Sequence, residues 1–234
     1  MTQPPEGPPG PDAVATVASR LVEVRGRIDA AARRAGRDPA SVTLVAVSKG
    51  IEVEVVRAGL LAGAVDLGEN RAQELVAKAG ILGRRPPVWH FLGRLQTNKV
   101  RLLAPWVDLW HSIDRDDLAA PLARHAPGAR VLVQVNTSGE AQKGGCAPEA
   151  TAALVERLAG HGLAVEGLMT VPELGADPRP AFAALRELAG GLGLAALSMG
   201  MTGDFEAAVE EGATIVRIGT AIFGPRRGAV PLLG

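Results

Sequence analysis

The feature that most constrains this fold is a regular alternation between short apolar runs and longer helical stretches. The apolar runs are rich in Val, Ile and Leu and predict β-strands at residues 42–47, 64–67, 88–92, 109–112, 131–135, 165–169, 195–198 and 215–218. Helical patterns follow at residues 52–61, 71–79, 98–102, 116–125, 148–161, 180–192 and 204–211. Eight strands alternating with helices predict parallel βα units, which close into a single α/β barrel of the (β/α)8 TIM type.

The segments outside this alternation lie towards the two ends of the chain. Residues 13–35 carry apolar Val17, Leu21, Val24 and Ile28 at helical spacing and predict an extra N-terminal helix. Residues 1–12 are rich in Pro and Gly and are predicted to be disordered. We therefore expect one barrel domain over residues 13–225 and a loose C-terminal tail over residues 226–234.

An open, doubly wound sheet is the competing fold. Such a sheet favours a G-x-G-x-x-G motif after its first strand, where this chain reads Ser48-Lys49-Gly50 instead. The chain has no tyrosine and only 3% aromatic residues, so its core is expected to be aliphatic. Aliphatic layers suit the interior of a barrel, which favours the barrel over the open sheet.

Charge and cysteine content exclude several classes of function. Lys and Arg total 25 and balance 25 Asp and Glu, so bulk charge points to neither nucleic acid nor an anionic membrane as a partner. No secretory signal pattern and no bilayer-length apolar run stands out, and a cytoplasmic protein is expected. A single cysteine, Cys146, excludes an internal disulfide, and no metal-binding motif is present. We interpret Cys146 as an incidental loop residue.

Lys49 directly follows the apolar run of the first predicted strand. In a barrel, functional side chains gather at the carboxyl ends of the strands. A lysine leaving the barrel core there has a partly desolvated amine, and its neutral, nucleophilic form becomes accessible. Such a lysine can form a Schiff base with an aldehyde. The alternative is a rim lysine that extends its amine into water.

Glycine and hydroxyl residues follow the last two predicted strands. Ser198 and Gly200 follow the seventh strand, and Gly219 and Thr220 follow the eighth. A phosphate site built from these two loops recurs in TIM barrels, because backbone N–H groups there approach an anion closely. Ordinary turn chemistry uses the same residues and remains the alternative.

Arg217 interrupts the apolar run of the eighth predicted strand. If Val216 and Ile218 face the helices, alternation along the strand points Arg217 into the barrel. A buried guanidinium needs an acceptor, and a pyridine nitrogen is one such acceptor. A salt bridge with Glu69 or Asp114 is the alternative.

Two histidines, His90 and His111, each follow a tryptophan in successive predicted strands. We interpret both as buried core histidines that have hydrogen-bond partners, rather than as catalysts.

Together, these motifs resemble the family of pyridoxal phosphate homeostasis proteins. The stretches that carry the resemblance run from about residue 42 to residue 224 and read LVAVSKG, DLGENRAQEL, WHFLGRLQTNK, HSID, VNTSGEAQKGG, GLMTV and LSMGMTGDFEAAVEEGATIVRIGTAIFG. The resemblance implies a fold-type III barrel that binds pyridoxal 5'-phosphate (PLP) as a Schiff base on Lys49. It also implies a role in intracellular PLP homeostasis without catalytic turnover. The cofactor contacts that it implies come from Asn70, Ser198, Gly200, Arg217, Gly219 and Thr220.

Two of the departures from the family pattern change the chemistry of the side chain. Many relatives have a second lysine where Ile51 stands, so a mechanism that needs that lysine is in doubt here. Relatives often have a tyrosine where Arg71 stands. A monomer that passes PLP to PLP-dependent apo-enzymes is compatible with the family, and Lys143 in the loop after the fifth strand is a candidate transient acceptor.

Two other functions remain open. A fold-type III enzyme such as an amino-acid racemase has the same barrel, but it adds a β-domain and a tyrosine base that this chain lacks. Lys143 or His90 would have to replace that base. A barrel aldolase would use Lys49 on its substrate directly, without PLP. The visible spectrum separates the aldolase from both PLP proteins, because only PLP bound to lysine is yellow.

Overall fold

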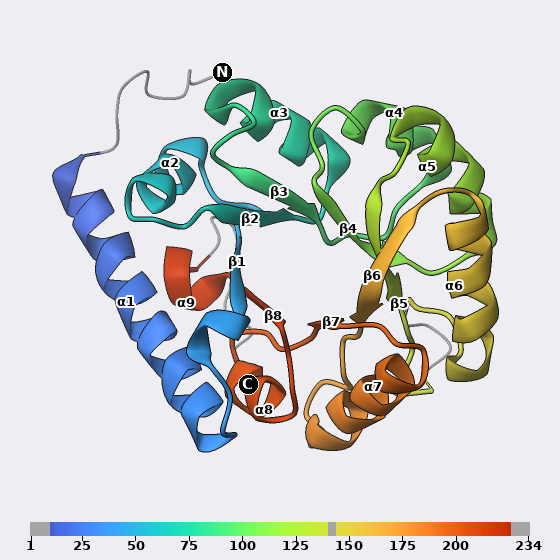
Figure 1. Ribbon diagram of the computed structural model, residues 1–234. Coiled ribbons are helices and arrows are strands. Elements are labelled where there is room, and N and C mark those ends of the chain that lie inside the picture. The colour runs from blue at the N-terminus through green and yellow to red at the C-terminus, as the bar shows by residue number, and fades with distance from the viewer. Residues whose placement is uncertain (1–9, 140–143, 226–234) are drawn as a thin grey trace.

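The computed structural model describes residues 10–139 and 144–225, which form a closed barrel of eight parallel strands (Figure 1). Each strand pairs with the next, and β8 returns to pair with β1. The strands are β1 (Thr43–Val47), β2 (Asp66–Glu69), β3 (Val88–Phe91), β4 (Leu109–Ile113), β5 (Arg130–Gln134), β6 (Ala164–Met169), β7 (Ala196–Ser198) and β8 (Ile215–Ile218). The predicted (β/α)8 barrel is confirmed.

Helices surround the barrel, one after each strand. They are α2 (Val53–Leu61), α3 (Ala72–Leu82), α4 (Val100–Leu103), α5 (Ala119–His125), α6 (Thr151–Gly160), α7 (Arg179–Gly191), α8 (Phe205–Glu210) and α9 (Thr220–Phe223). Short 3-10 turns are η1 (Pro39–Ser41), η2 (Thr97–Lys99), η3 (Asp116–Leu118) and η4 (Pro148–Ala150). The extra helix α1 (Pro11–Arg34) lies outside this ring and packs on α2, α8 and α9 (Figure 1).

Helix α1 begins two residues earlier than the sequence pattern predicts. Pro11 and Asp12 are helical, although they fall in the segment predicted to be disordered. Proline is well suited to a first helical position because the N–H that it lacks would have no partner within the helix there. The negative charge of Asp12 in the first turn interacts favourably with the positive end of the helix dipole. The rest of that segment, residues 1–9, and the predicted tail at 226–234 lie outside the described residues.

Two further boundaries differ from the prediction. Strand β2 is displaced towards Gly68 and Glu69, because the pairing of Leu67 with Trp89 and of Glu69 with Phe91 extends it. Ala64, predicted to begin the strand, lies before it, directly after the turn that ends at Gly63, whose φ is +95°. Helix α9 was expected to be a loop. Its four residues are too few for a periodic pattern to reveal.

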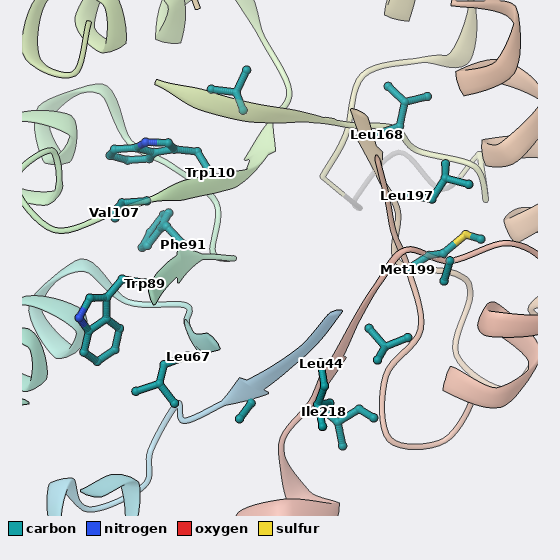
Figure 2. Packing of buried hydrophobic residues seen from close by; sticks show 14 of the residues in the cluster. Leu44, Leu67, Trp89, Phe91, Val107, Trp110, Leu168, Leu197, Met199 and Ile218 are labelled. Carbon is teal, nitrogen blue, oxygen red and sulfur yellow. The ribbon is translucent and has the colours of Figure 1, made fainter. Parts of the chain in front are cut away.

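The strands bury two separate apolar faces. The outer face packs against the helices and carries Trp89, Phe91 and Trp110, which lie side by side on β3 and β4 in Figure 2. The inner face is small and consists of Val45, Leu109, Leu132, Met169 and Ile215. Five apolar residues do not fill a barrel of eight strands, and polar side chains occupy much of the rest, as described below.

Candidate functional site

The predicted site residues lie on four strands that are consecutive around the barrel, β7, β8, β1 and β2. Lys49 follows β1 after Ser48, Asn70 follows β2 directly, Ser198 ends β7, and Gly219 follows β8. Since parallel strands place their carboxyl ends on one side, these residues share one face of the barrel. The structure therefore brings the predicted set together around one half of the rim.

A buried lysine anchors the backbone on one side of Lys49. Lys78, on α3, is only 6% exposed. Its ammonium donates to the carbonyl oxygen of Ser48 at 2.5 Å and to Oε1 of Glu69 at 2.7 Å. The Ser48 hydroxyl also donates to Glu69 Oε1, at 2.7 Å. Burial raises the pKa of the Glu69 carboxyl, and Lys78 opposes that rise.

A second carboxylate anchors the other side. Glu74 Oε1 accepts from the backbone N–H of Gly50 at 2.5 Å and from Lys78 at 2.9 Å. Both residues that flank Lys49 are thus tied to one cluster of charges. The sequence analysis missed this cluster, although Glu74 and Lys78 stand four residues apart on a helix, the spacing of a favourable ion pair.

Arg217 points into the barrel, as predicted from strand alternation. Val216 and Ile218 pack with the outer core, and Arg217 is 5% exposed. Its guanidinium donates from Nη1 to Ser198 Oγ at 2.7 Å and from Nη2 to the carbonyl oxygen of Thr170 at 2.9 Å. Both partners are uncharged.

Neither proposed salt bridge to Arg217 forms. Glu69 pairs with Lys78, and Asp114 pairs with Arg115 at 2.8 Å. Among residues 10–139 and 144–225, no carboxylate forms an ion pair with Arg217. Burial lowers the pKa of Arg217 to about 10, so the side chain remains a cation at neutral pH.

The two histidines belong to a hydrogen-bonded chain that crosses the barrel. Asp66 Oδ1 lies 3.0 Å from His90 Nε2, His90 Nδ1 lies 2.9 Å from His111 Nε2, and His111 Nδ1 lies 2.8 Å from Ser198 Oγ. Ser198 then meets Arg217. Because β4 and β7 are not neighbours, the contact between His111 and Ser198 spans the interior. Burial, helped by the charges of His90 and Arg217, lowers the pKa of His111 well below its usual value.

The prediction that both histidines are buried and have polar partners is confirmed. His90 is 4% exposed and His111 is fully buried. Sequence reasoning missed that they bond to each other and to Ser198. The available signal was that each histidine follows an outward-facing tryptophan, which places both imidazoles on the inner face of adjacent strands.

The loop after β7 lies against β8. The backbone N–H of Arg217 donates to Gly200 O at 2.9 Å. Gly200 has a φ of +92°, and a Cβ on it would lie 2.6 Å from Ala208 Cβ, so only glycine fits there. Gly219 precedes Thr220 at the start of α9, where the first N–H groups have no acceptor within the helix. These features suit an anion site.

Two buried oxygen atoms near Lys49 are left without a hydrogen bond in the described part of the chain. They are Asn70 Oδ1 and Glu69 Oε2. Buried polar atoms are nearly always satisfied by protein, water or ligand. The unpaired Asn70 oxygen is therefore expected to bond to a bound molecule, in line with the predicted role of Asn70 as a cofactor contact.

Two other candidates from the sequence, Cys146 and Lys143, belong to the segment that follows β5. Cys146 is partly buried, and burial raises the pKa of its thiol, which makes it a poor nucleophile. Lys143 lies outside the described residues. Within residues 10–139 and 144–225, there is no cluster of metal ligands, and no helix is long and apolar enough to cross a membrane.

The closed parallel barrel with a lysine after its first strand has the architecture of the fold-type III class of PLP-binding barrels. The family described as "Alanine racemase, N-terminal domain" matches residues 21–227. Solved structures below 25% identity share the fold alone. One is alanine racemase from Corynebacterium glutamicum, with a TM-score of 0.66 at 18% identity, which covers 94% of this chain and 64% of its own.

Curated relatives narrow the class to one family. The Pyridoxal phosphate homeostasis protein of Pseudomonas aeruginosa is 46% identical, covering 93% of this chain and 99% of its own length. Its Escherichia coli K12 namesake is 39% identical, covering 90% and 97%. This chain belongs to the family of pyridoxal phosphate homeostasis proteins. PipY of Synechococcus elongatus, solved with PLP bound, is 32% identical with a TM-score of 0.76, covering 89% of this chain and 100% of that chain.

Proposed function

We propose that this protein binds PLP in intracellular PLP homeostasis and holds it covalently through Lys49, without catalytic turnover. The observation that carries the proposal is the buried Arg217 cation, which forms no ion pair with any described residue although two glycine loops and Lys49 share its face of the barrel. A buried cation that no carboxylate contacts is costly, although the charge of Asp204 offsets part of that cost, so the site favours a ligand that brings negative charge or a hydrogen-bond acceptor to Arg217. The names of the curated relatives support the same cofactor.

PLP matches the chemistry of this site in three places. When bound, it supplies an aldehyde that reacts with a lysine amine to form a Schiff base. Its phosphate suits the loops that begin at Ser198 and Gly219, with close approach at Gly200, Gly219 and Thr220. Its pyridine nitrogen accepts from Arg217. The Asn70 amide offers a further contact.

Lys49 is the lysine best placed for the covalent link. The chain contains four lysines, Lys49, Lys78, Lys99 and Lys143. Lys78 is buried and its ammonium donates to three oxygens, so its amine is held in place as a charged donor. Lys99 follows β3, which lies beyond β2 from the other site residues. The charge cluster around Lys78 holds the backbone on both sides of Lys49 and positions its side chain.

The same geometry favours holding PLP over driving chemistry on it. Arg217 can only donate hydrogen bonds, so the pyridine nitrogen stays unprotonated and withdraws electrons weakly. Racemisation of an amino acid also needs a second base on the opposite face. Tyrosine, which serves as that base in alanine racemase-type enzymes, is absent from these 234 residues.

Borohydride reduction followed by peptide mapping tests the attachment point. We expect a pyridoxyl group on Lys49 and loss of the yellow colour in Lys49→Ala, with the unfolding midpoint unchanged because Lys49 adds little to the core. Lys99→Ala is the matched control and should keep the colour. An adduct found mainly on Lys99 or Lys143 would refute the assignment.

Turnover and transfer are tested separately. Holo-protein mixed with a PLP-free aminotransferase should restore the activity of that enzyme. The same preparation should show no appreciable racemisation of amino acids. Rapid racemisation that disappears in Lys49→Ala would replace the carrier function with that of a fold-type III racemase.

A further inference from the structure

The chain from Asp66 to Arg217 ends in two groups with opposite hydrogen-bonding character. A guanidinium only donates hydrogen bonds, and an ionised carboxylate only accepts them. Asp66 has a side chain that is 31% exposed, at the start of β2, whereas Arg217 is buried among the site residues. The groups between them, His90, His111 and Ser198, are buried and each can donate one bond while accepting another.

With both imidazoles neutral, these ends leave one arrangement of protons. Asp66 must accept from His90 Nε2–H, so His90 Nδ1 is bare and accepts from His111 Nε2–H. His111 Nδ1 is then bare in its turn and accepts the hydroxyl proton of Ser198. Ser198 Oγ finally accepts from Arg217 Nη1–H. Every donor therefore points from Arg217 towards Asp66, through bonds of 2.7–3.0 Å.

The competing arrangement adds a proton to His90. His90 would then donate from both nitrogens, His111 would carry its proton on Nδ1, and the Ser198 hydroxyl proton would be free to bond elsewhere. That state places a second cation on a buried chain that already contains Arg217, and within the described residues Asp66 is the one carboxylate hydrogen-bonded to that chain. The arrangement with two neutral imidazoles avoids this charge and is the one that we favour.

We propose that this chain makes Ser198 a positioning residue for Arg217 rather than a phosphate ligand. Its hydroxyl proton is committed to His111, so its oxygen serves as the acceptor that, with Thr170 O, fixes the guanidinium plane. His111 and His90 act through Ser198, and Asp66 sets the direction of the chain. The role of Arg217 at the pyridine ring rests on the proposed function, but the proton arrangement does not.

Nitrogen-15 NMR of the histidines in the PLP-free protein tests the arrangement directly. At neutral pH, we expect both His90 and His111 to be neutral, with the proton on Nε2. A proton on Nδ1 of His111, or a doubly protonated His90, would overturn the proposal whether or not PLP binds.

Substitutions at the exposed end test whether Asp66 sets the direction. Asp66→Asn keeps an oxygen that accepts from His90, so both histidines should keep the Nε2–H form. Asp66→Ala removes the acceptor, and Nδ1–H forms should appear at both histidines. If Asp66→Ala leaves the proton positions unchanged, Asp66 does not have this role. Asp66 is partly exposed at a strand end, so both variants are expected to fold.

Ligands with and without phosphate separate the two roles of Ser198. If Ser198 positions Arg217, Ser198→Ala should weaken binding of PLP and of pyridoxal, which lacks the phosphate, by the same factor of about 10. If the hydroxyl instead bonds to the phosphate, only PLP binding weakens, and the proposal fails. Failure of both ligands to bind the wild-type protein would instead refute the proposed function and leave the NMR result standing.

Discussion

Two buried cations in this barrel, Lys78 and Arg217, have different kinds of partners. Around β1 and β2, Lys78 is neutralised by Glu69 and Glu74 within one compact cluster. Across β8, β7, β4 and β3, the hydrogen bonds that lead from the Arg217 cation join only uncharged groups until the chain reaches Asp66 near the surface, and Asp204 acts on Arg217 without an ion pair.

We infer that the charges around Lys78 stabilise the protein, whereas the charge of Arg217 serves the binding of the ligand. Ions neutralised inside the protein fix the backbone, here the segment that carries Lys49, and leave little charge for a ligand. A buried cation that no carboxylate contacts costs folding energy, but a ligand that binds beside it offsets that cost. Each prediction below tests one side of this comparison against the other.

The largest effect is expected at Lys78. Lys78→Met leaves the buried Glu69 carboxylate without its ammonium, and breaking a buried pair in this way costs about 3–5 kcal/mol. Urea unfolding of the PLP-free protein measures the loss. The double variant Lys78→Met/Glu69→Gln removes both charges and should recover most of the stability.

An exposed ion pair supplies the control for that measurement. Arg130 and Glu166 contact each other at 2.5 Å, but their side chains are 54% and 33% exposed. Arg130→Met should therefore cost less than about 1 kcal/mol. An equal loss in Arg130→Met and Lys78→Met would mean that burial of the Lys78 cluster has no special weight.

Arg217→Met should show the reverse pattern. Because a buried cation without an ion pair costs folding energy, replacing it with an apolar side chain is expected to keep or raise the stability of the PLP-free protein. PLP affinity should fall by about 10- to 100-fold, the value of a hydrogen bond to a charged group. Fluorescence titration with PLP measures the affinity. The control is Arg25→Met, because Arg25 lies on α1 and donates to the carbonyl oxygen of Val42 rather than to a residue of the site. A stability loss as large as that of Lys78→Met would remove the contrast between the two sides.

The smallest effect is a pH dependence that comes from His111. Its pKa is lowered in the folded state, so between about pH 6.5 and that lower value the unfolded chain binds the extra proton. Stability is therefore retained above about pH 6.5 and is lost as the pH falls, by at most about 1.4 kcal/mol per pH unit. The groups that face His111 are His90 on β3, Ser198 on β7 and Arg217 on β8, with Asp66 on β2 beyond His90.

Unfolding measured at several pH values below neutrality tests this dependence. His111→Leu removes the titrating group, so its stability should fall less steeply with acid than that of the wild type. His161→Gln, at an exposed position, should leave the slope unchanged. Equal slopes in His111→Leu and the wild type would show that His111 is not the titrating group.

The sequence predicted the barrel well because its signals are local. The short β-branched runs and the helical patterns between them can be read from neighbouring residues, and alternation along β8 placed Arg217 inside correctly. Lys49, Asn70, Ser198 and Gly219 were expected to meet because strand ends in a parallel barrel lie together. The errors fell where tertiary pairing outweighs local preference, as at β2, or where an element is too short to show periodicity, as at α9.

The sequence by itself determined the order of elements, the inward direction of Arg217 and the rim position of Lys49. Only the tertiary structure decided which partners the buried polar groups take. The bond between His111 and Ser198 joins residues 87 positions apart, and Lys78 reaches back 30 positions to Ser48. No local pattern encodes such pairs, because closing the barrel creates both the low-dielectric interior and the distances that make these bonds strong.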